Sequence, residues 1–223
     1  MPKVLATQRK FLERKDEIQG DIGQSRVLNG PVGSAYLEIG NTKVMCSVNG
    51  PKEQSGDFSA DGSLNVFLHG MEPGTNIQFT IISALNAVVC LKKFSRAKID
   101  IELNVIADDG GILAACIMAA GVALISANIE CFDLALACNL LICDDGDRFI
   151  LDPTLSQIRK HKEKGVTATI AIIPSLGQVV CTDVDGLIKK STLDKVVRYG
   201  FKKCLEMYPL MSETLRSESG NLF

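Results

Sequence analysis

The sequence predicts an α/β (α+β) protein in which helices cover a mixed sheet. Apolar residues make up 46% of the 223 residues, which is enough to build a core and excludes bulk disorder. Runs with strand-like alternation and runs with helical spacing follow one another, and no linker or repeat separates them. We therefore expect one folded domain over residues 21–213, between an N-terminal extension, residues 1–20, and a C-terminal tail, residues 214–223.

The first half of the domain predicts three strands and then a helix. Residues 34–39 and 42–48 are rich in β-formers and flank Gly40-Asn41, a two-residue turn typical of a β-hairpin. Residues 63–68 alternate apolar and polar side chains, as a third strand does. Residues 75–91 place apolar side chains at helical intervals after a Pro-Gly pair.

The second half predicts a strand, a central helix, further strands and a last helix. Residues 98–106 alternate as a half-buried strand does, and residues 110–129 are uncharged and rich in glycine and alanine. The uncharged run is long enough to span a membrane, but acidic residues bracket it without basic anchors, so we expect a helix packed closely on a sheet. The later strands are expected at residues 134–143, 149–151, 167–173 and 178–182, and the last helix at residues 192 to about 212.

The charge balance argues against a protein that binds nucleic acid on its own. The chain has 24 Lys and Arg against 26 Asp and Glu, a formal charge of -2 and a pI near 5.8. Non-specific affinity for nucleic acid comes largely from the neutralisation of phosphates by a basic surface. Any contact with RNA is therefore expected to be local or shared with other chains.

The cysteines and the N-terminus predict a reducing, intracellular compartment. Eight cysteines lie in apolar runs without a CxxC pair, and only two histidines are present, so we expect reduced, buried thiols and no zinc site. Residues 1–20 mix acidic and basic side chains and lack the apolar stretch of a secretory signal.

Two acidic turns are candidate sites, and each also has a structural interpretation. Residues 108–111, Asp-Asp-Gly-Gly, end a strand and open a helix, where backbone N–H groups can hold a phosphate, but the pattern is also typical of a glycine-assisted turn. Asp144, Asp145 and Asp147 could bind magnesium or form a solvated loop tip around a glycine. We expect the carboxylate of Asp152 to satisfy local backbone donors.

Basic residues cluster twice, and each cluster predicts either a solvated surface or a contact with phosphates or an acidic partner. The clusters are Lys92, Lys93, Arg96 and Lys98, and Arg159, Lys160, Lys162 and Lys164 around His161. Aromatic residues are nearly absent from both, which argues against a platform that stacks single-stranded bases. A GxSxG motif is missing, so the residues alone indicate no nucleophilic catalysis.

Six motifs occur in a recognisable order. They are GSAYLEIGNTKV at 33–44, VNGP at 48–51, IDI at 99–101, DGG at 109–111, the small-residue run at 120–133 and LDPT at 151–154. Together they resemble the RNase PH family over roughly residues 24–212, and within it the RNase PH-like ring subunits of the eukaryotic RNA exosome.

The resemblance implies a ring of RNase PH folds around a channel through which RNA passes. The implied partners are other RNase PH-like exosome ring subunits, cap proteins, and RNA in the shared channel, with no membrane. It implies roles in RNA processing and degradation, including rRNA processing, in the nucleus, the nucleolus and the cytoplasm. It implies no cofactor.

The resemblance also indicates where active members bind the attacking phosphate. Their glycine pair, here Gly110 and Gly111, continues with Ser or Thr and then Arg, whose donors hold the anion. Ile112 and Leu113 occupy these two places, and neither side chain can donate a hydrogen bond. We therefore expect a degenerate phosphate site at Gly110, Gly111, Ile112 and Leu113.

Two further active-site groups are replaced when the family pattern is carried over. A pair of aspartates, one suited to acid or metal-assisted work, corresponds to His161 and Thr167, and residues 155–173 contain no Asp at all. An arginine pair that holds the RNA backbone corresponds to residues 73–76, which read Pro-Gly-Thr-Asn. These replacements predict a chain without catalytic residues and without a metal.

Three interpretations follow from the sequence. The first is a non-catalytic structural subunit of the exosome core ring. In that case the possible contacts with RNA or with other subunits are Lys92, Lys93, Arg96, Arg159, Lys160 and Lys162. The second is an active phosphate-dependent 3′-5′ exoribonuclease of the RNase PH type, which would need the groups that are replaced. The third is an unrelated α/β enzyme or binding module for a small molecule.

Overall fold

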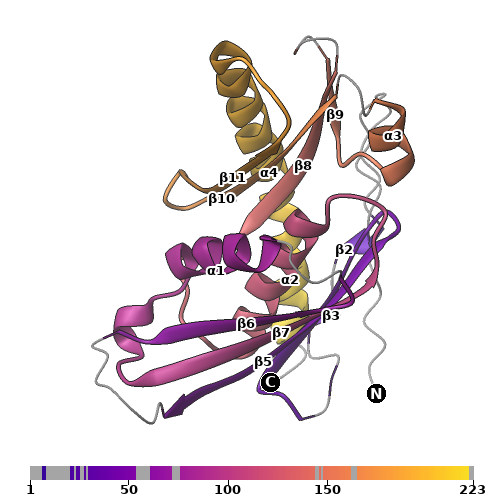
Figure 1. The fold of residues 1–223 in the computed structure, drawn as a ribbon. Helices are drawn as coiled ribbons and strands as arrows, with labels where there is room; N and C mark the ends of the chain where they lie inside the picture. Colours follow the sequence, from indigo (N-terminus) through magenta and orange to yellow (C-terminus); the bar gives the residue numbers. More distant parts are fainter. Residues whose placement is uncertain are drawn as a thin grey trace.

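Two β-sheets with helices between them make up most of the chain that the structure describes (Figure 1). The structure is a computed structural model. It describes residues 7–8, 21–22, 24–25, 28, 30–53, 61–71, 76–143, 146, 148–161 and 165–220.

The first sheet has five strands in the order β3-β4-β5-β7-β6. Its strands are β3 (Gln24–Ser25), β4 (Gly33–Ile39), β5 (Thr42–Glu53), β6 (Ser63–His69) and β7 (Ala97–Ala107). The predicted hairpin is confirmed, because Ile39 pairs with Thr42 across the Gly40-Asn41 turn. Strand β6 pairs with β7 in parallel, which makes the sheet mixed, as predicted. A short sheet of β1 (Thr7–Gln8) and β2 (Asp21–Ile22) precedes it.

The strands of the second half form a sheet of their own, in the order β11-β10-β8-β9. They are β8 (Leu136–Cys143), β9 (Arg148–Leu151), β10 (Val166–Ile173) and β11 (Gln178–Asp185), and all their pairings are antiparallel. The α+β class is confirmed, but the expectation of one sheet is wrong. Helices pack on both sides of this second sheet, and every residue of β8 is buried.

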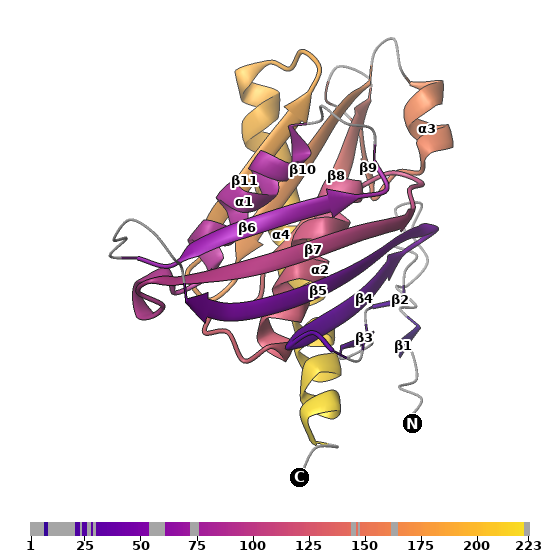
Figure 2. The same cartoon turned by 60° about the horizontal axis from the view of Figure 1, so that its bottom comes forward.

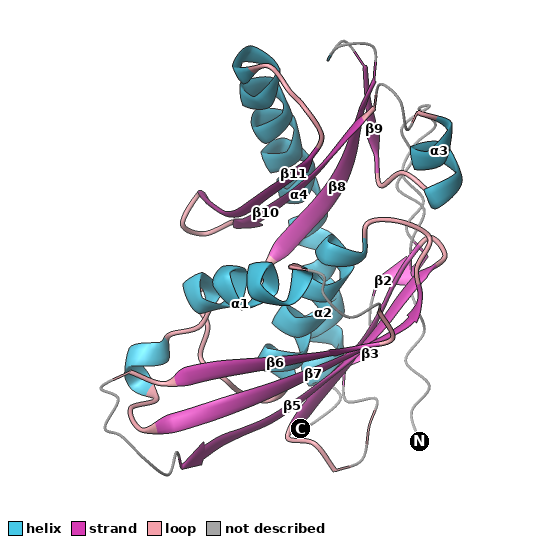
Figure 3. Cartoon of the chain, in the orientation of Figure 1, coloured by secondary structure: helices cyan, strands magenta, loops and turns pink. Residues whose placement is uncertain are grey.

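Helix α2 (Ile112–Ser126) lies between the two sheets (Figure 3), together with α1 (Ile77–Val88). Every residue of α2 from Ile112 to Leu124 is buried, as expected for a helix surrounded by protein on all sides. The approach to the first sheet is close: a Cβ on Gly33 would lie 2.4 Å from the backbone nitrogen of Ala127. Among the helices of the described residues, none has both the length and the apolar character needed to cross a bilayer.

Helix α4 (Lys190–Gly220) packs on the second sheet through Gly200, whose Cβ would lie 2.8 Å from Cγ1 of Ile170. The helix continues past the predicted end near residue 212. Pro209 interrupts one backbone hydrogen bond, but Met207 and Met211 stay buried on either side of it, so packing carries the helix through. Figure 2 looks onto the outer face of the five-stranded sheet, which the described helices leave uncovered.

Between the strands expected at residues 149–151 and 167–173, where no helix was predicted, the structure has helix α3 (Leu155–Lys160). Its start is a capping box: the backbone nitrogen of Gln157 donates to the side chain of Thr154, and the backbone nitrogen of Thr154 donates to Oε1 of Gln157. This Thr-x-x-Gln spacing is the sequence pattern from which the start of the helix could have been predicted. The short 3₁₀ helix η1 (Leu91–Lys93) follows α1.

All eight cysteines are free, as predicted, and six of them are buried. Cys90 and Cys131 are only half-buried, because they lie where the end of α1 meets the segment before β8. Burial raises the pKa of the Cys116 and Cys131 thiols to about 12, so both are protonated at neutral pH.

Replacing Gly33 with Ala should destabilise the protein, because the new Cβ would clash with the backbone at the end of α2, which cannot move aside. We expect a loss of about 1–3 kcal/mol in the free energy of unfolding, measured by urea denaturation. Gly121→Ala is the matched control. Its Cβ would lie 3.2 Å from Cβ of Ala135, and the gain in helix propensity, about 1 kcal/mol, opposes the crowding. Equal effects of the two substitutions would contradict the proposed tight contact.

Candidate functional site

The glycine turn between β7 and α2 is the centre of the candidate site. Gly110 has a φ of 107° and Gly111, the N-cap of α2, has a φ of 69°, both in the left-handed region. A Cβ on Gly110 would lie 2.4 Å from the carbonyl oxygen of Pro153. The interpretation of this pattern as a glycine-assisted turn is confirmed.

Thr42, the first residue of β5, fixes this turn from the hairpin. Its Oγ1 accepts a hydrogen bond from the backbone nitrogen of Asp109 at 2.9 Å and donates one to the carbonyl oxygen of Gly110 at 2.7 Å. The side chain of Thr42 is buried. Nothing in the local sequence signals this role, because Thr42 is an ordinary β-forming residue at the start of a strand.

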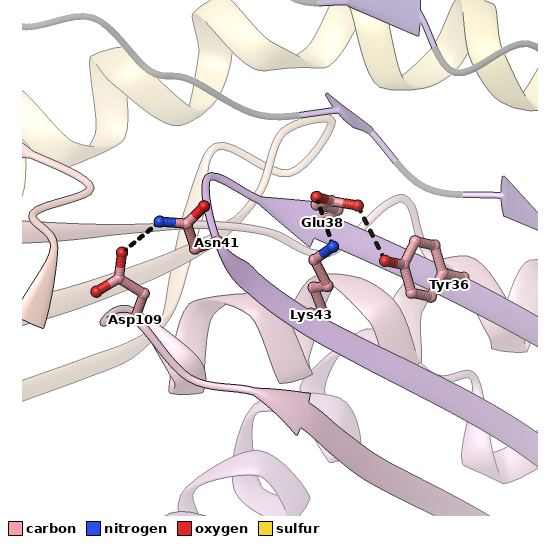
Figure 4. A network of polar contacts seen from close by, with 5 residues as sticks. All are labelled: Tyr36, Glu38, Asn41, Lys43 and Asp109. Atoms are coloured by element: carbon pink, nitrogen blue, oxygen red, sulfur yellow. Dashed lines mark hydrogen bonds and ion pairs between the residues drawn. The ribbon is translucent and has the colours of Figure 1, made fainter.

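Asn41 adds a contact from the tip of the same hairpin (Figure 4). Its Nδ2 donates to Oδ2 of Asp109 at 2.9 Å. On the neighbouring strand surface, the hydroxyl of Tyr36 donates to Oε2 of Glu38 at 2.9 Å, and Lys43 pairs with Oε1 of the same carboxylate at 3.2 Å. The acidic groups near this turn are therefore engaged by neutral donors or by lysine.

The start of α3, directly after the LDPT segment, also holds the turn. The backbone nitrogen of Leu155 donates to the carbonyl oxygen of Asp109 at 2.8 Å. Asp152 has a φ of 46°, and its Oδ1 accepts from the backbone nitrogen of Asn139 at 3.1 Å. This carboxylate therefore satisfies a backbone donor as expected, but the donor lies 13 positions away on β8 and is not local.

Ile112 and Leu113 take part in the core. Their exposed fractions are 9% and 5%, and both belong to the main apolar cluster. They follow Gly111 directly, so the first residues of α2 offer backbone N–H groups but no side-chain donor.

Helix α3 leads from the glycine turn to His161, one of the two positions to which the family's aspartates are assigned above. Its Ile158 lies against Gly110, with Cδ1 at 3.4 Å from where a Cβ would be, and its C-cap His161 lies against Gly165. Nδ1 of His161 is 3.0 Å from the carbonyl oxygen of Gln157. Thr167, half-buried on β10, lies opposite Leu141 and Asp185. Helix α3 therefore packs against the glycine turn through Ile158 and carries His161 at its C-terminal end, whereas Thr167 lies on β10 between β8 and β11.

The two basic clusters are not brought together. Arg159 and Lys160 are exposed on the last turn of α3, whereas Lys92 and Lys93 lie on η1, at the other side of the molecule in both views (Figures 1 and 2). Lys93 forms an ion pair with Glu130, and this hydrogen bond raises the pKa of Lys93. Arg96 follows η1 in a left-handed conformation, with φ 59°.

Some predicted positions fall outside the described residues. They are Lys162 and Lys164, Asp144, Asp145 and Asp147, and residues 73–75 of the segment 73–76. Asn76, the last residue of that segment, is the N-cap of α1. Within the part of the chain that the structure describes, no three His, Cys, Asp or Glu side chains gather as metal ligands would.

Fold and sequence comparisons agree on one family. The family model for the 3' exoribonuclease family, domain 1 (RNase PH), matches residues 21–130. The exosome complex component MTR3 of Mus musculus is 30% identical over 220 residues, which cover 85% of this chain and 79% of that protein. MTR3 of Homo sapiens is 29% identical with the same coverage. The chain belongs to the RNase PH family.

The solved structures and the finer resemblance point the same way. The crystal structure of rice (Oryza sativa) Rrp46 matches with a TM-score of 0.81 at 20% identity, covering 92% of this chain and 98% of that one. Residues 200–210 and the GSAYLE start also predict similarity to the Mtr-type ring subunit, exosome component six in animals. The two MTR3 relatives confirm this prediction.

Replacing Thr42 with Val should cost about 1–2 kcal/mol of unfolding free energy, because it leaves the half-buried Asp109 N–H and Gly110 carbonyl without their partner while keeping the side-chain volume. Thr42→Ser keeps the hydroxyl and should retain most of the stability. Both are measured by urea denaturation. A Val variant as stable as the Ser variant would show that the hydroxyl does not hold the turn.

Proposed function

We propose that this chain is a non-catalytic structural subunit of an RNA exosome core ring. It helps to form the channel through which RNA passes during 3′-5′ processing and degradation, including rRNA processing. Its relatives are named as exosome complex components, and the matched family is described as 3' exoribonucleases. In this proposal residues 21–213 are the ring domain, and residues 1–20 and 214–223 are its extension and tail.

One observation supports a non-catalytic role. The backbone of the candidate site is held in place, but the side chains that would bind phosphate and act as an acid are replaced. Thr42, the LDPT segment and α3 hold the glycine turn, yet its next two residues, Ile112 and Leu113, are buried in the core. Removing one donor that stabilises developing charge typically costs about a hundredfold to a thousandfold in rate. Loss of the phosphate donors and of the acid together supports an inert site.

The edges of the two sheets support a chain that associates with others. β6 and β11 are the outer strands of their sheets, and α1 lies beside both. Phe67 on β6 and Phe79 on α1 are exposed by 46% and 71%. Exposed aromatic side chains near unpaired strand edges are typical of protein interfaces. The partners in this proposal are other RNase PH-like ring subunits and cap proteins, in the nucleus, the nucleolus and the cytoplasm.

The candidate residues that the sequence predicts have two roles in this proposal. Gly110, Gly111, Ile112 and Leu113, with His161 and Thr167, are the degenerate remains of a phosphate and acid site. Lys92, Lys93, Arg96, Arg159, Lys160 and Lys162 are proposed to contact RNA or neighbouring subunits.

Incubation of the purified chain with inorganic phosphate and an oligo-RNA should release no nucleoside diphosphate, because the donors for phosphate and the general acid are absent. Release is measured by chromatography of the products, and His161→Ala and Thr167→Ala serve as matched variants. Processive release by the native chain that either substitution abolishes would establish the alternative, an active phosphate-dependent 3′-5′ exoribonuclease.

Expression together with RNase PH-like exosome subunits should yield a stable hetero-oligomer, because the exposed edges and aromatic side chains become buried in it. Native mass spectrometry of the co-purified complex gives its composition. A chain that stays monomeric beside all candidate ring partners would contradict a role in the ring, whatever the outcome of the phosphorolysis assay.

A further inference from the structure

The outer side of α4 carries a stripe of three cations, Lys195, Arg198 and Lys202, which we call the α4 stripe. All three are exposed, and their spacing places them on one face of the helix with neighbouring Cβ atoms about 5–6 Å apart. The opposite face is fixed to the second sheet: Val196 and Cys204 are fully buried. The helix therefore cannot rotate to hide the stripe.

Acidic side chains do not neutralise the α4 stripe. The ion pairs of the described residues involve Lys43, Lys52, Lys93 and Lys203, and none of the three stripe residues. On the same helix Asp194 lies four positions before Arg198 and Glu206 four positions after Lys202; Glu206 pairs with Lys203, and neither carboxylate forms an ion pair with the stripe. A chain with a formal charge of -2 thus concentrates positive charge on one side of one helix.

The α4 stripe begins at Lys195, beyond the contact between Gly146 and the start of the helix. Gly146, before β9, comes close to the start of α4: a Cβ on it would lie 2.3 Å from Cγ2 of Thr192. Lys189 and Lys190 precede that contact in the sequence and are left out. Lys195 and the two residues beyond it lie farther along the helix.

We propose that the α4 stripe binds the phosphate backbone of single-stranded RNA. This inference rests on the proposed function, which brings the chain into contact with RNA. Regularly spaced, exposed cations suit a chain of phosphates, and backbone contacts of this kind position RNA without reading its sequence. The centre of a protein interface is instead depleted of charge and needs apolar anchors. Between Lys195 and Lys202 every apolar side chain is buried or half-buried, and Leu205 beyond them is a single exposed apolar side chain and no cluster.

The test replaces the three cations by neutral residues of similar length in the full chain: Lys195→Gln, Arg198→Gln and Lys202→Gln. Binding to a fluorescent oligouridine is followed by anisotropy at several salt concentrations. The affinity should fall by about tenfold, since each exposed ion pair is weak alone. The slope of log K against log salt should become shallower by about 2, because each lost contact with a single strand removes about 0.7.

A matched control removes the same charge outside α4: Lys43→Gln, Lys52→Gln and Arg148→Gln. It should keep the native affinity and salt slope. The inference is overturned if the stripe variant binds RNA like the native chain, if the control loses as much, or if the stripe variant loses binding only to a polyglutamate probe, which would indicate an acidic protein partner. All substituted stripe positions are exposed, and equal urea midpoints of the variants show that the fold is kept.

Co-purification with ring subunits separates this inference from the function on which it rests. If the native chain fails to assemble, the ring role is wrong. If the stripe variant assembles and binds RNA as tightly as the native chain, only the RNA contact on α4 is wrong.

Discussion

Helix α2 touches both sheets at distances that only small residues permit, and the arrangement of the other elements depends on this contact. Gly33 lets β4 approach the backbone at the end of the helix, and Gly121 lets the helix approach Ala135 before β8. Larger side chains at these places would push the sheets apart and open voids in a core that is close-packed elsewhere. The same small, uncharged residues explain why this segment resembles a membrane span in composition while it is a buried helix of 15 residues.

The position of α2 also determines the candidate site, because the glycine turn is its N-terminus. Three separate segments surround this turn: the hairpin through Thr42, the start of α3 through the backbone nitrogen of Leu155, and β8 through Asn139, whose Cβ lies 3.3 Å from where a Cβ on Gly111 would be. None of these contacts requires a phosphate or a catalytic acid. Each buried hydrogen bond of this kind contributes about 1 kcal/mol to stability. The motif can therefore persist for the sake of the fold after its chemistry has been lost, which is why an intact glycine turn alone is weak evidence for activity.

The sequence predicts features that short-range periodicity controls and misses those that depend on distant pairing. The hairpin at Gly40-Asn41 and the strands with alternating side chains were predictable because the turn and the period are local. The division into two sheets was not, since periodicity does not say which strands pair. Helix α3 has only six residues and too little apolar pattern to reveal it, and its sole signal was the spacing of Thr154 and Gln157. The hydrogen bond from the backbone nitrogen of Asp109 to Oγ1 of Thr42 joins residues 67 positions apart, and no local sequence pattern predicts it.

The net charge of the sequence does not show how the charges are distributed over the structure. On the first sheet, carboxylates and lysines neutralise one another: Asp100 accepts from Asn65, which lowers its pKa, and it also pairs with Lys52. On α4, Lys203 pairs with Glu206, whereas Lys195, Arg198 and Lys202 form no ion pair among the described residues. Screening limits the reach of a surface charge to about 8–10 Å at physiological salt, so the two regions act independently and their sum describes neither. A chain that is nearly neutral as a whole is thus a poor binder of nucleic acid by its overall field, while one of its helices carries the local positive charge that the proposed contact with RNA needs.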